Sequence, residues 1–306
     1  MPDKGIKFSS LFGPGQVICG LGEVSRNEAL KRLVELIAAT GRISDIGEVY
    51  RLVVQREELS CTILGPGIAV PHARIENLDS LKVAIAVNPE GIDYHEGSDP
   101  VRLIVMILTP ADDPGGYLQA QAALAKVCVR HETLVEDLCE LADPEAVWRT
   151  FDEEGGSLPD YVAAGHMMSR EYPFLRETDP LNKAIDRFYS LGIAEMPVID
   201  NDGDLVGVVS QRELLRVCLP EHITWMDDLS PVLHFEPFTQ VLRNEERTWL
   251  ADIMSPDYVT LAEDAPAIEV AREMIRTGAS RVFVTRGKKL VGVITIQGFL
   301  SKVLRD

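Results

Sequence analysis

One histidine of this 306-residue chain stands in a setting that suits a reactive side chain. His72 follows Pro71, which closes the short run Gly-Pro-Gly-Ile-Ala-Val at residues 65–70. Glycine permits backbone conformations closed to other residues, and proline drives the residue before it into extended backbone. The sequence therefore predicts His72 at a strand end or in a tight turn, outside any helix. A neutral imidazole there is a candidate nucleophile, because an unperturbed pKa of about 6.5 leaves it mostly uncharged at pH 7.

The segment upstream of His72 strengthens this interpretation. It reads Arg56-Glu57-Glu58-Leu59-Ser60-Cys61-Thr62. From there to Arg74, the chain resembles the active-site segment of the fructose/mannitol/nitrogen type of enzyme IIA, a domain of the bacterial phosphoenolpyruvate-dependent phosphotransferase system. The resemblance covers residues 6–151, and it implies that His72 accepts a phosphoryl group from a histidine phosphocarrier protein.

A phosphoryl group on His72 needs hydrogen-bond donors around its oxygens. Arg56 and Arg74 stand at the two ends of the resembling segment and are candidates for charge-assisted hydrogen bonds to it. Backbone N–H groups of residues 65–69 are further candidate donors. The alternative for each arginine is a surface salt bridge.

One position departs from the pattern of the family. Its members commonly carry a second histidine at the start of a helix, in the part of the domain that corresponds to residues 112–119, and this chain has Tyr117 there. A phenol, with a pKa near 10, can donate a hydrogen bond to a phosphoryl oxygen but is no cation at neutral pH. Tyr117 is therefore either a site residue or a packing residue at a helix start.

The elements that must position these residues alternate between helices and strands. Residues 27–37 repeat apolar side chains at the spacing of one helix face, with Ser25 as a candidate N-cap. We expect an α/β domain over residues 1–151, with a sheet covered by helices. The other predicted elements are buried strands at 81–87 and 101–108 and helices at 118–128 and 131–141.

The composition changes after residue 151. Residues 152–161 are acidic and Gly-rich and have no apolar pattern, as expected for an interdomain linker. A second domain over residues 162–306 contains an internal repeat, in which Met-Ser at 168–169 returns at 254–255 and Leu-Val-Gly-Val at 205–208 returns at 290–293. Each copy predicts strand, helix, strand, turn, strand and helix, at about residues 165–217 and 251–306, and two copies should pack as a pseudo-symmetric pair.

This repeat resembles a tandem pair of CBS domains. The resemblance rests on the two Met-Ser starts, on Met196-Pro197-Val198, and on the strand ends Gly-Val-Val-Ser and Gly-Val-Ile-Thr. It implies a regulatory adenosine nucleotide, AMP, ADP or ATP, in the clefts between the repeats, and it requires no cofactor. Two pseudo-symmetric repeats also present a flat helical face on which a twofold partner can repeat the contact, so we expect a homodimer.

The strand ends carry the candidate nucleotide ligands. In ligand-binding CBS domains a Ser or Thr after the strand serves phosphate, and an Asp three residues on grips the ribose hydroxyls. Here Ser210 is followed by Glu213, whereas Thr295 is followed by Gly298, which offers no carboxylate, so we favour the first cleft. Each hydroxyl also suits a helix N-cap. The candidates are Met196, Ser210, Arg212 and Glu213 in the first copy and Arg281, Thr295 and Gln297 in the second.

The two copies are separated by residues 219–250, which exceed a simple connector. The segment includes Trp225 and Trp249, and it predicts one or two amphipathic helices that cover apolar surface, for example at a dimer interface. His222 and His234 lack the spacing of metal ligands, so no metal site is predicted.

Composition narrows the class of protein. A formal net charge of −18 opposes nonspecific binding to nucleic acid. The five cysteines are scattered and never form a Cys-x-x-Cys pair, as expected for reduced thiols. The first five residues lack the apolar core of a signal peptide, and no run approaches the ~20 apolar residues of a membrane helix. We expect a cytoplasmic protein with no nucleic-acid partner and no membrane insertion.

Two functions stay open. In the first, the chain is a regulatory phosphocarrier: His72 accepts phosphate, the modified domain regulates an unknown protein, and the CBS pair senses adenosine nucleotide. In the second, the enzyme IIA fold is a non-catalytic interaction module gated by nucleotide binding to the CBS pair. Tyr117 tells against the first and the intact segment 56–74 against the second, which leaves open whether the chain is an enzyme.

Overall fold

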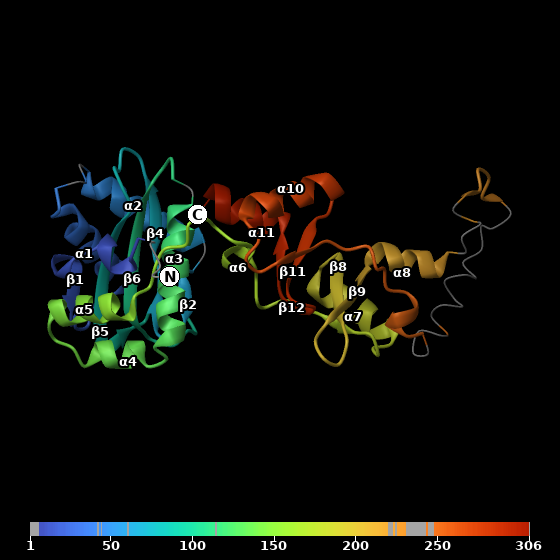
Figure 1. The fold of residues 1–306 in the computed structure, drawn as a ribbon, viewed down its shortest axis with the longest axis horizontal. Coiled ribbons are helices and arrows are strands. Elements are labelled where there is room, and N and C mark those ends of the chain that lie inside the picture. The colour runs from blue at the N-terminus through green and yellow to red at the C-terminus, as the bar shows by residue number, and fades with distance from the viewer. Residues whose placement is uncertain are drawn as a thin grey trace. The chain divides into compact units, whose positions relative to one another are not determined.

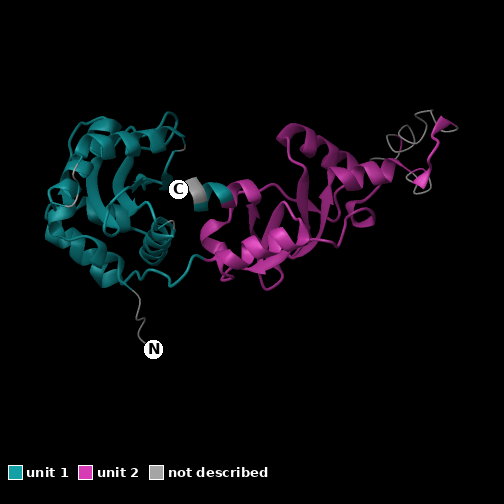
Figure 2. Ribbon diagram, turned by 90° about the horizontal axis from the view of Figure 1, so that it is seen from above, with its two compact units in different colours: residues 1–162, 300–306 teal, residues 163–299 magenta. Residues whose placement is uncertain are grey.

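The computed structural model describes residues 6–41, 43, 45–59, 61–113, 115–219, 223, 225–230, 243 and 248–305. The chain divides into two compact units, residues 1–162 with 300–306 and residues 163–299 (Figure 2). Helix α5 (Pro144–Glu154) continues through the first three residues of the predicted linker. Most of the segment 219–250, including His222 and His234, lies outside the described residues, and so does its predicted helical character.

The first unit is built on one mixed sheet (Figure 1). Strands β5 (Lys82–Ile92) and β6 (Val101–Pro110) form its antiparallel centre. Both strands are buried on their two faces, which explains why their sequences read as nearly continuous apolar runs. The predicted strands at 81–87 and 101–108 are thereby confirmed. The other strands are β1 (Val17–Cys19), β2 (Ile63–Gly65), β3 (Ile68–Ala69) and β4 (His72–Ile75), in the order β1-β5-β6-β3-β2 with β4 also on β6.

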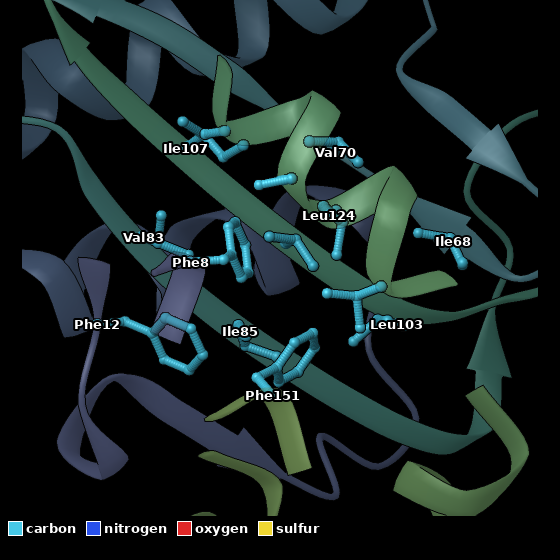
Figure 3. Packing of buried hydrophobic residues seen from close by; sticks show 14 of the residues in the cluster. Phe8, Phe12, Ile68, Val70, Val83, Ile85, Leu103, Ile107, Leu124 and Phe151 are labelled. Atoms are coloured by element: carbon cyan, nitrogen blue, oxygen red, sulfur yellow. The ribbon is translucent and has the colours of Figure 1, made fainter. Parts of the chain in front are cut away.

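Helices cover both faces of this sheet. Alternate residues of β5 and β6 point to opposite faces, so one face packs on α1 (Arg26–Ala38) and α2 (Ile46–Leu59) and the other on α3 (Gly116–Arg130), α4 (Leu134–Cys139) and α5. Phe8, Phe12 and Phe151 pack together in the second of these layers (Figure 3). Two short 3-10 helices, Phe8–Leu11 and Pro14–Gln16, precede β1. The predicted α/β sheet covered by helices is confirmed.

Helix boundaries agree with the sequence in one case and differ in another. Ser25 caps α1, because its hydroxyl accepts the backbone N–H of Glu28 at 3.2 Å, as predicted. The predicted helix at 131–141 is shorter and covers only α4. His131 instead ends α3, and its imidazole lies between the carboxylates of Asp137, at 2.6 Å, and Glu154, at 2.8 Å. These two contacts hold the chain in a turn where the apolar periodicity alone suggested a helix.

The second unit contains the two predicted repeats. The first has β7 (Leu175–Arg176), α7 (Leu181–Leu191), β8 (Glu195–Ile199), β9 (Leu205–Ser210) and α8 (Gln211–Cys218). The second has β10 (Thr260–Ala262), α10 (Ala267–Thr277), β11 (Arg281–Arg286), β12 (Lys289–Thr295) and α11 (Ile296–Leu300). Each forms a three-stranded sheet, β7-β8-β9 or β10-β11-β12, so the predicted element order is confirmed. The unit also has two short helices, α6 (Ala164–Met167) and the 3-10 helix Leu250–Asp252, and the π-helix Ser301–Arg305 after α11 belongs to the first unit.

The start of each repeat crosses to the sheet of the other repeat. Ser169 pairs with Val293 of β12, and Ser255 pairs with Val208 of β9. The preceding methionines lie over the glycines of the two Leu-Val-Gly-Val strands: a Cβ added at Gly292 would lie 2.6 Å from Cγ of Met168, and one added at Gly207 would lie 2.6 Å from Sδ of Met254. A larger residue at either glycine would force the methionine above it to shift, which explains why both copies of the repeat have glycine at this position.

Among the described residues, no helix combines the length and the apolar character that crossing a membrane requires.

Candidate functional site

His72 is the first residue of β4, at the strand end that the sequence predicts. β4 runs parallel to β6 with His72 opposite Ile107, whose backbone N–H donates to the carbonyl of Pro71 at 2.9 Å. The side chain is 3% exposed. Sheet pairing therefore fixes the backbone on either side of a histidine that is buried within the first unit.

The turn before His72 explains the glycines in its motif. Gly67 has a φ of +73°, in the region that side chains other than glycine rarely adopt. Its carbonyl accepts the backbone N–H groups of Arg102 at 2.8 Å and Leu103 at 2.9 Å. This anchors the turn between β2 and β3 on β6 and sets the register in which β4 follows.

The imidazole of His72 is held in one tautomer. Its Nδ1 lies 3.1 Å from the backbone carbonyl oxygen of Val70, and a carbonyl can only accept a hydrogen bond. Nδ1 must therefore carry the proton, which leaves the lone pair on Nε2. Nε2 is shielded from solvent. The geometry thus assigns the proton to Nδ1 and the lone pair to Nε2.

Tyr117 lies directly on this imidazole. It stands in the first turn of α3, is 5% exposed, and its ring stacks on the His72 ring with centroids 3.7 Å apart and an interplanar angle of 19°. The structure thus brings together two candidates that are 45 positions apart in the sequence. Stacking covers a face of the imidazole, whereas the Nε2 lone pair lies in the ring plane.

The two candidate arginines come from elements next to His72. Arg56 lies half-buried in the last turn of α2, which packs against β4. Arg74 is two residues after His72 in β4, and the alternation of a strand places it on the same face. Its Nη2 donates to the backbone carbonyl of Val303 at 2.9 Å, within the first unit. Arg74 therefore lies on the side of the sheet on which His72 stands, whereas α2, which carries Arg56, is one of the helices that cover the opposite face.

A buried carboxylate close to this motif makes contacts that the sequence did not reveal. Glu57 is 3% exposed and accepts two hydrogen bonds from Thr62, from the backbone N–H at 3.0 Å and from Oγ1 at 2.6 Å. The carbonyl of Thr62 in turn accepts the N–H of Val70 at 2.9 Å. Both residues belong to the motif on which the resemblance rests, but only the pairing of β2 with β3 connects them to the histidine.

In the first CBS repeat, Ser210, Arg212 and Glu213 lie at the start of α8, whereas Met196 lies in β8. Ser210 is the N-cap, and its hydroxyl accepts the N–H groups of Arg212 and Glu213. The Glu213 carboxylate reaches back to the backbone N–H of Ser210 at 3.1 Å and accepts a very short hydrogen bond from its hydroxyl. Arg212 is exposed, whereas the side chain of Met196 is fully buried in the core of the repeat. Ser210 and Glu213 thus form a capping box.

The second CBS repeat has a different charge at the equivalent place. Arg281 begins β11 opposite Thr295, and Glu195 begins β8 opposite Ser210. Arg281 donates a short hydrogen bond to the backbone carbonyl of Glu195. Burial raises the pKa of Glu195, Arg281 opposes this rise and Glu213 adds to it. Thr295 accepts the N–H of Gly298 at 3.0 Å, and Gln297 is exposed.

Metal-binding groups and reactive cysteines are two other kinds of site that the described part of the chain could hold. There, no group of three or more His, Cys, Asp and Glu side chains is placed to hold a metal ion. All five cysteines are described, lie half-buried and form no disulfide. Burial raises the pKa of Cys128 to about 11, so that thiol stays protonated at neutral pH.

Comparisons with known proteins agree with these two units. The family model for the phosphoenolpyruvate-dependent sugar phosphotransferase system, EIIA 2, matches residues 10–154, and the CBS domain model matches residues 164–220 and 250–305. The fructose-specific EIIA component of Haloferax volcanii is 32% identical over 124 residues, 40% of this chain and 80% of that protein. A nitrogen regulatory protein of Bradyrhizobium diazoefficiens is 27% identical over 160 residues, 51% of this chain and 99% of that protein.

Similar proteins are also found among solved structures. One, a CBS domain-containing protein from Kribbella flavida, has 19% sequence identity and a TM-score of 0.41 and covers 47% of this chain and 99% of its own.

Proposed function

Because the chain belongs to the EIIA 2 family of the phosphotransferase system and carries a pair of CBS domains, we propose that it is a cytoplasmic regulatory phosphocarrier whose acceptor is Nε2 of His72. The observation that supports this most directly is the hydrogen bond between Nδ1 of His72 and the Val70 carbonyl. Because Nδ1 carries the proton, Nε2 has its lone pair already and needs no general base to remove a proton from it. A histidine phosphocarrier protein is the donor in this proposal.

The transfer itself is a balanced exchange between two imidazoles. The Nε2 lone pair of His72 attacks phosphorus, a new P–N bond forms, and the P–N bond of the donor breaks with its electron pair returning to the donor ring. The Nδ1 proton of His72 stays in place and donates to Val70. Because the phosphorylated ring is cationic, that hydrogen bond becomes charge-assisted and strengthens.

Two arginines and one tyrosine stabilise the transferred group in this proposal. Arg56 and Arg74 donate charge-assisted hydrogen bonds to the phosphoryl oxygens, and the Tyr117 hydroxyl donates a neutral one. Their support is their placement: Tyr117 stacks on the ring, Arg74 shares its strand face, and Arg56 lies on the helix that packs against β4.

Intact-mass measurement after incubation with phosphoenolpyruvate and the general phosphocarrier proteins tests the proposal. We expect a gain of about 80 Da, one phosphoryl group. The modification should be acid-labile and alkali-stable, as a phosphoramidate is, and His72→Ala should abolish it. His95→Ala and His131→Ala, two other histidines of the first unit, are the matched controls and should retain it. A wild-type chain that gains no mass with competent donors contradicts the proposal.

The competing function is an interaction module without phosphotransfer. The observation that favours it is Tyr117, which stands where family members commonly have a histidine and packs flat on the acceptor ring. The same mass measurement separates the two functions, because a pure module gains no phosphoryl group under any donor condition.

We also propose that the CBS pair binds an adenosine nucleotide, with the cleft around Ser210, Arg212 and Glu213 as the better site. Glu213 retains lone pairs for a ribose diol although it also accepts from Ser210. Loss of a charge-assisted hydrogen bond costs roughly 1.5–3 kcal/mol, so Glu213→Ala should weaken binding by about tenfold to a hundredfold. The second cleft is the alternative site, because Arg281 stands there at the position that Glu195 has in the first repeat, and a cation beside Thr295 suits a phosphate group.

Calorimetry with AMP, ADP and ATP on three proteins decides this. The proteins are wild type, Glu213→Ala, and Gly298→Asp, which adds the carboxylate that the second repeat lacks. Glu213→Gln is the matched control for the capping box, because its amide oxygen still accepts from the Ser210 N–H. No heat at millimolar nucleotide, or an unchanged affinity in Glu213→Ala, means that the pair is a structural unit.

Homodimerisation through the CBS pair completes the proposal. Exposed apolar side chains gather on its two long helices: Tyr189 of α7 is 92% exposed, and Ile268 and Ile275 of α10 are 78% and 84% exposed. Large apolar side chains with this exposure are typical of interaction sites. Light scattering of the full chain at micromolar concentration should show a dimer, and Ile275→Glu should dissociate it. A monomeric wild type rules the dimer out.

A further inference from the structure

The buried carboxylate of Glu57 is unexplained by packing alone. Burying a carboxylate is costly unless hydrogen bonds compensate for the lost water, and Glu57 is 3% exposed. Its two oxygens accept the N–H and the hydroxyl of Thr62 separately, Oε1 at 3.0 Å and Oε2 at 2.6 Å. An apolar residue at this position would have filled the space without that cost. The carboxylate therefore specifies where Thr62 lies.

The position of Thr62 is transmitted to the acceptor ring. The Thr62 carbonyl accepts the N–H of Val70 at 2.9 Å, and the Val70 carbonyl accepts Nδ1–H of His72 at 3.1 Å. Pro71 follows Val70 and has no N–H, so the hydrogen bond from Val70 to Thr62 extends the pairing of β2 with β3 up to the residue that binds the imidazole. Four residues thus form one chain of hydrogen bonds, from the end of α2 to the imidazole.

The surroundings of Glu57 increase the strength of this chain. Tyr94 is 2% exposed, and its phenol has a raised pKa because of burial and, second, because of the charge of Glu57. The carboxylate thus acts in a low-dielectric setting, in which hydrogen bonds are stronger and an unsatisfied group costs more. Glu58, the next residue, is exposed and provides an internal comparison.

We propose that Glu57 is a positioning residue for phosphoryl transfer: through Thr62 and the Val70 carbonyl, it keeps His72 in the Nδ1-protonated tautomer with Nε2 as the acceptor. This inference rests on the proposed function of His72. Glu57 itself does not handle the phosphoryl group. Its removal lets the Val70 carbonyl shift, and the ring then populates the other tautomer, in which Nε2 carries the proton and has no lone pair to react.

The experiment measures the tautomer and the reaction independently on the full chain. Imidazole ¹⁵N resonances at alkaline pH, assigned to His72 by their loss in His72→Ala, report which nitrogen is protonated. Glu57→Ala should move them toward the Nε2-protonated form and slow phosphorylation by about 10- to 100-fold at saturating donor, the range expected for a misplaced reacting group. Glu58→Ala should change neither.

A second pair of variants keeps the carboxylate and guards against misfolding. Thr62→Val removes Oγ1 with little change in shape and should shift the tautomer and the rate, whereas Thr62→Ser retains both donors and should restore them. Wild-type ¹⁵N resonances in Glu57→Ala, or equal rates in Thr62→Ser and Thr62→Val, overturn the positioning role. If the resonances move but even wild type gains no phosphoryl group, the proposed function has failed and the control of the tautomer stands.

Discussion

Substitution of Tyr117 by Phe separates the two things that this residue can do for His72. The phenyl ring preserves the stack, at 3.7 Å between centroids, and the burial of the side chain, and only the hydroxyl is lost. A hydrogen bond to a charged group is worth roughly 1.5–3 kcal/mol. If the hydroxyl contacts the phosphoryl group only during transfer, this whole difference appears in the rate, as a decrease of about tenfold to 150-fold.

Stability gives the second half of the same test. Tyr117→Leu removes the stack but keeps an apolar side chain, and an aromatic pair contributes about 0.5–1.5 kcal/mol beyond its buried area. We therefore expect Tyr117→Leu, and not Tyr117→Phe, to lower the free energy of unfolding in urea by about that amount. The rate is followed by intact mass at saturating donor. A Tyr117→Phe protein that accepts phosphate at the wild-type rate would refute the hydroxyl role and leave Tyr117 as a packing residue.

Three further outcomes are expected. The hydrogen bond to Asp137, and after it the one to Glu154, raises the pKa of His131. The charged imidazole therefore stabilises the fold fully below the ordinary histidine pKa, and this stabilisation is lost as the pH rises through the raised value. In urea, His131→Gln should be as stable as wild type at alkaline pH and less stable at pH 5, and a difference that does not change with pH would contradict the assignment. Gly292→Ala should lower the free energy of unfolding by about 1–3 kcal/mol, because the added methyl group overpacks against Met168. In denaturant titrations, the double variant Gly292→Ala/Met168→Ala should lose less stability than the sum of the two single variants, and strictly additive losses would show that the two side chains do not contact each other. Deletion of residues 301–306 removes the Val303 carbonyl and releases the Arg74 N–H that donates to it, so phosphorylation of His72, followed by intact mass, should become faster. The same deletion in an Arg74→Ala protein should give no increase, and an increase there would mean that the segment acts through another residue.

Local chemistry was sufficient to predict the elements that present His72. A proline before the histidine, glycines in the turn and the apolar run Ile68-Ala69-Val70 predict His72 at a strand end or in a tight turn, and the structure has it as the first residue of β4. Ser25 as a cap and the two central strands followed from residue type and spacing in the same way. These features depend on neighbours in sequence, which is why the sequence alone predicts them.

Contacts between distant residues were not predictable by the same reasoning. The stack of Tyr117 on His72 needs α3 to start where β4 begins, and the hydrogen bond from Val70 to Thr62 needs a particular register between β2 and β3. The helix predicted at 131–141 failed for a related reason, because His131 finds carboxylates on two other segments and ends α3 there. The periodicity of apolar residues shows which face of a helix is buried, but it does not show which distant residues that helix or its ends will contact.

The exchange of the Met-Ser starts makes the two CBS repeats inseparable as folding units. Ser169 pairs with a sheet whose strands lie more than ninety residues later in the chain, and Ser255 pairs in the same way with the sheet of the first repeat. A chain cut between the repeats would leave both sheets with an open edge, and open edges recruit strands from other copies. Unfolding of the pair should therefore be a single cooperative transition. A ligand that stabilises one cleft then protects both repeats against unfolding, without any change of shape at the second cleft.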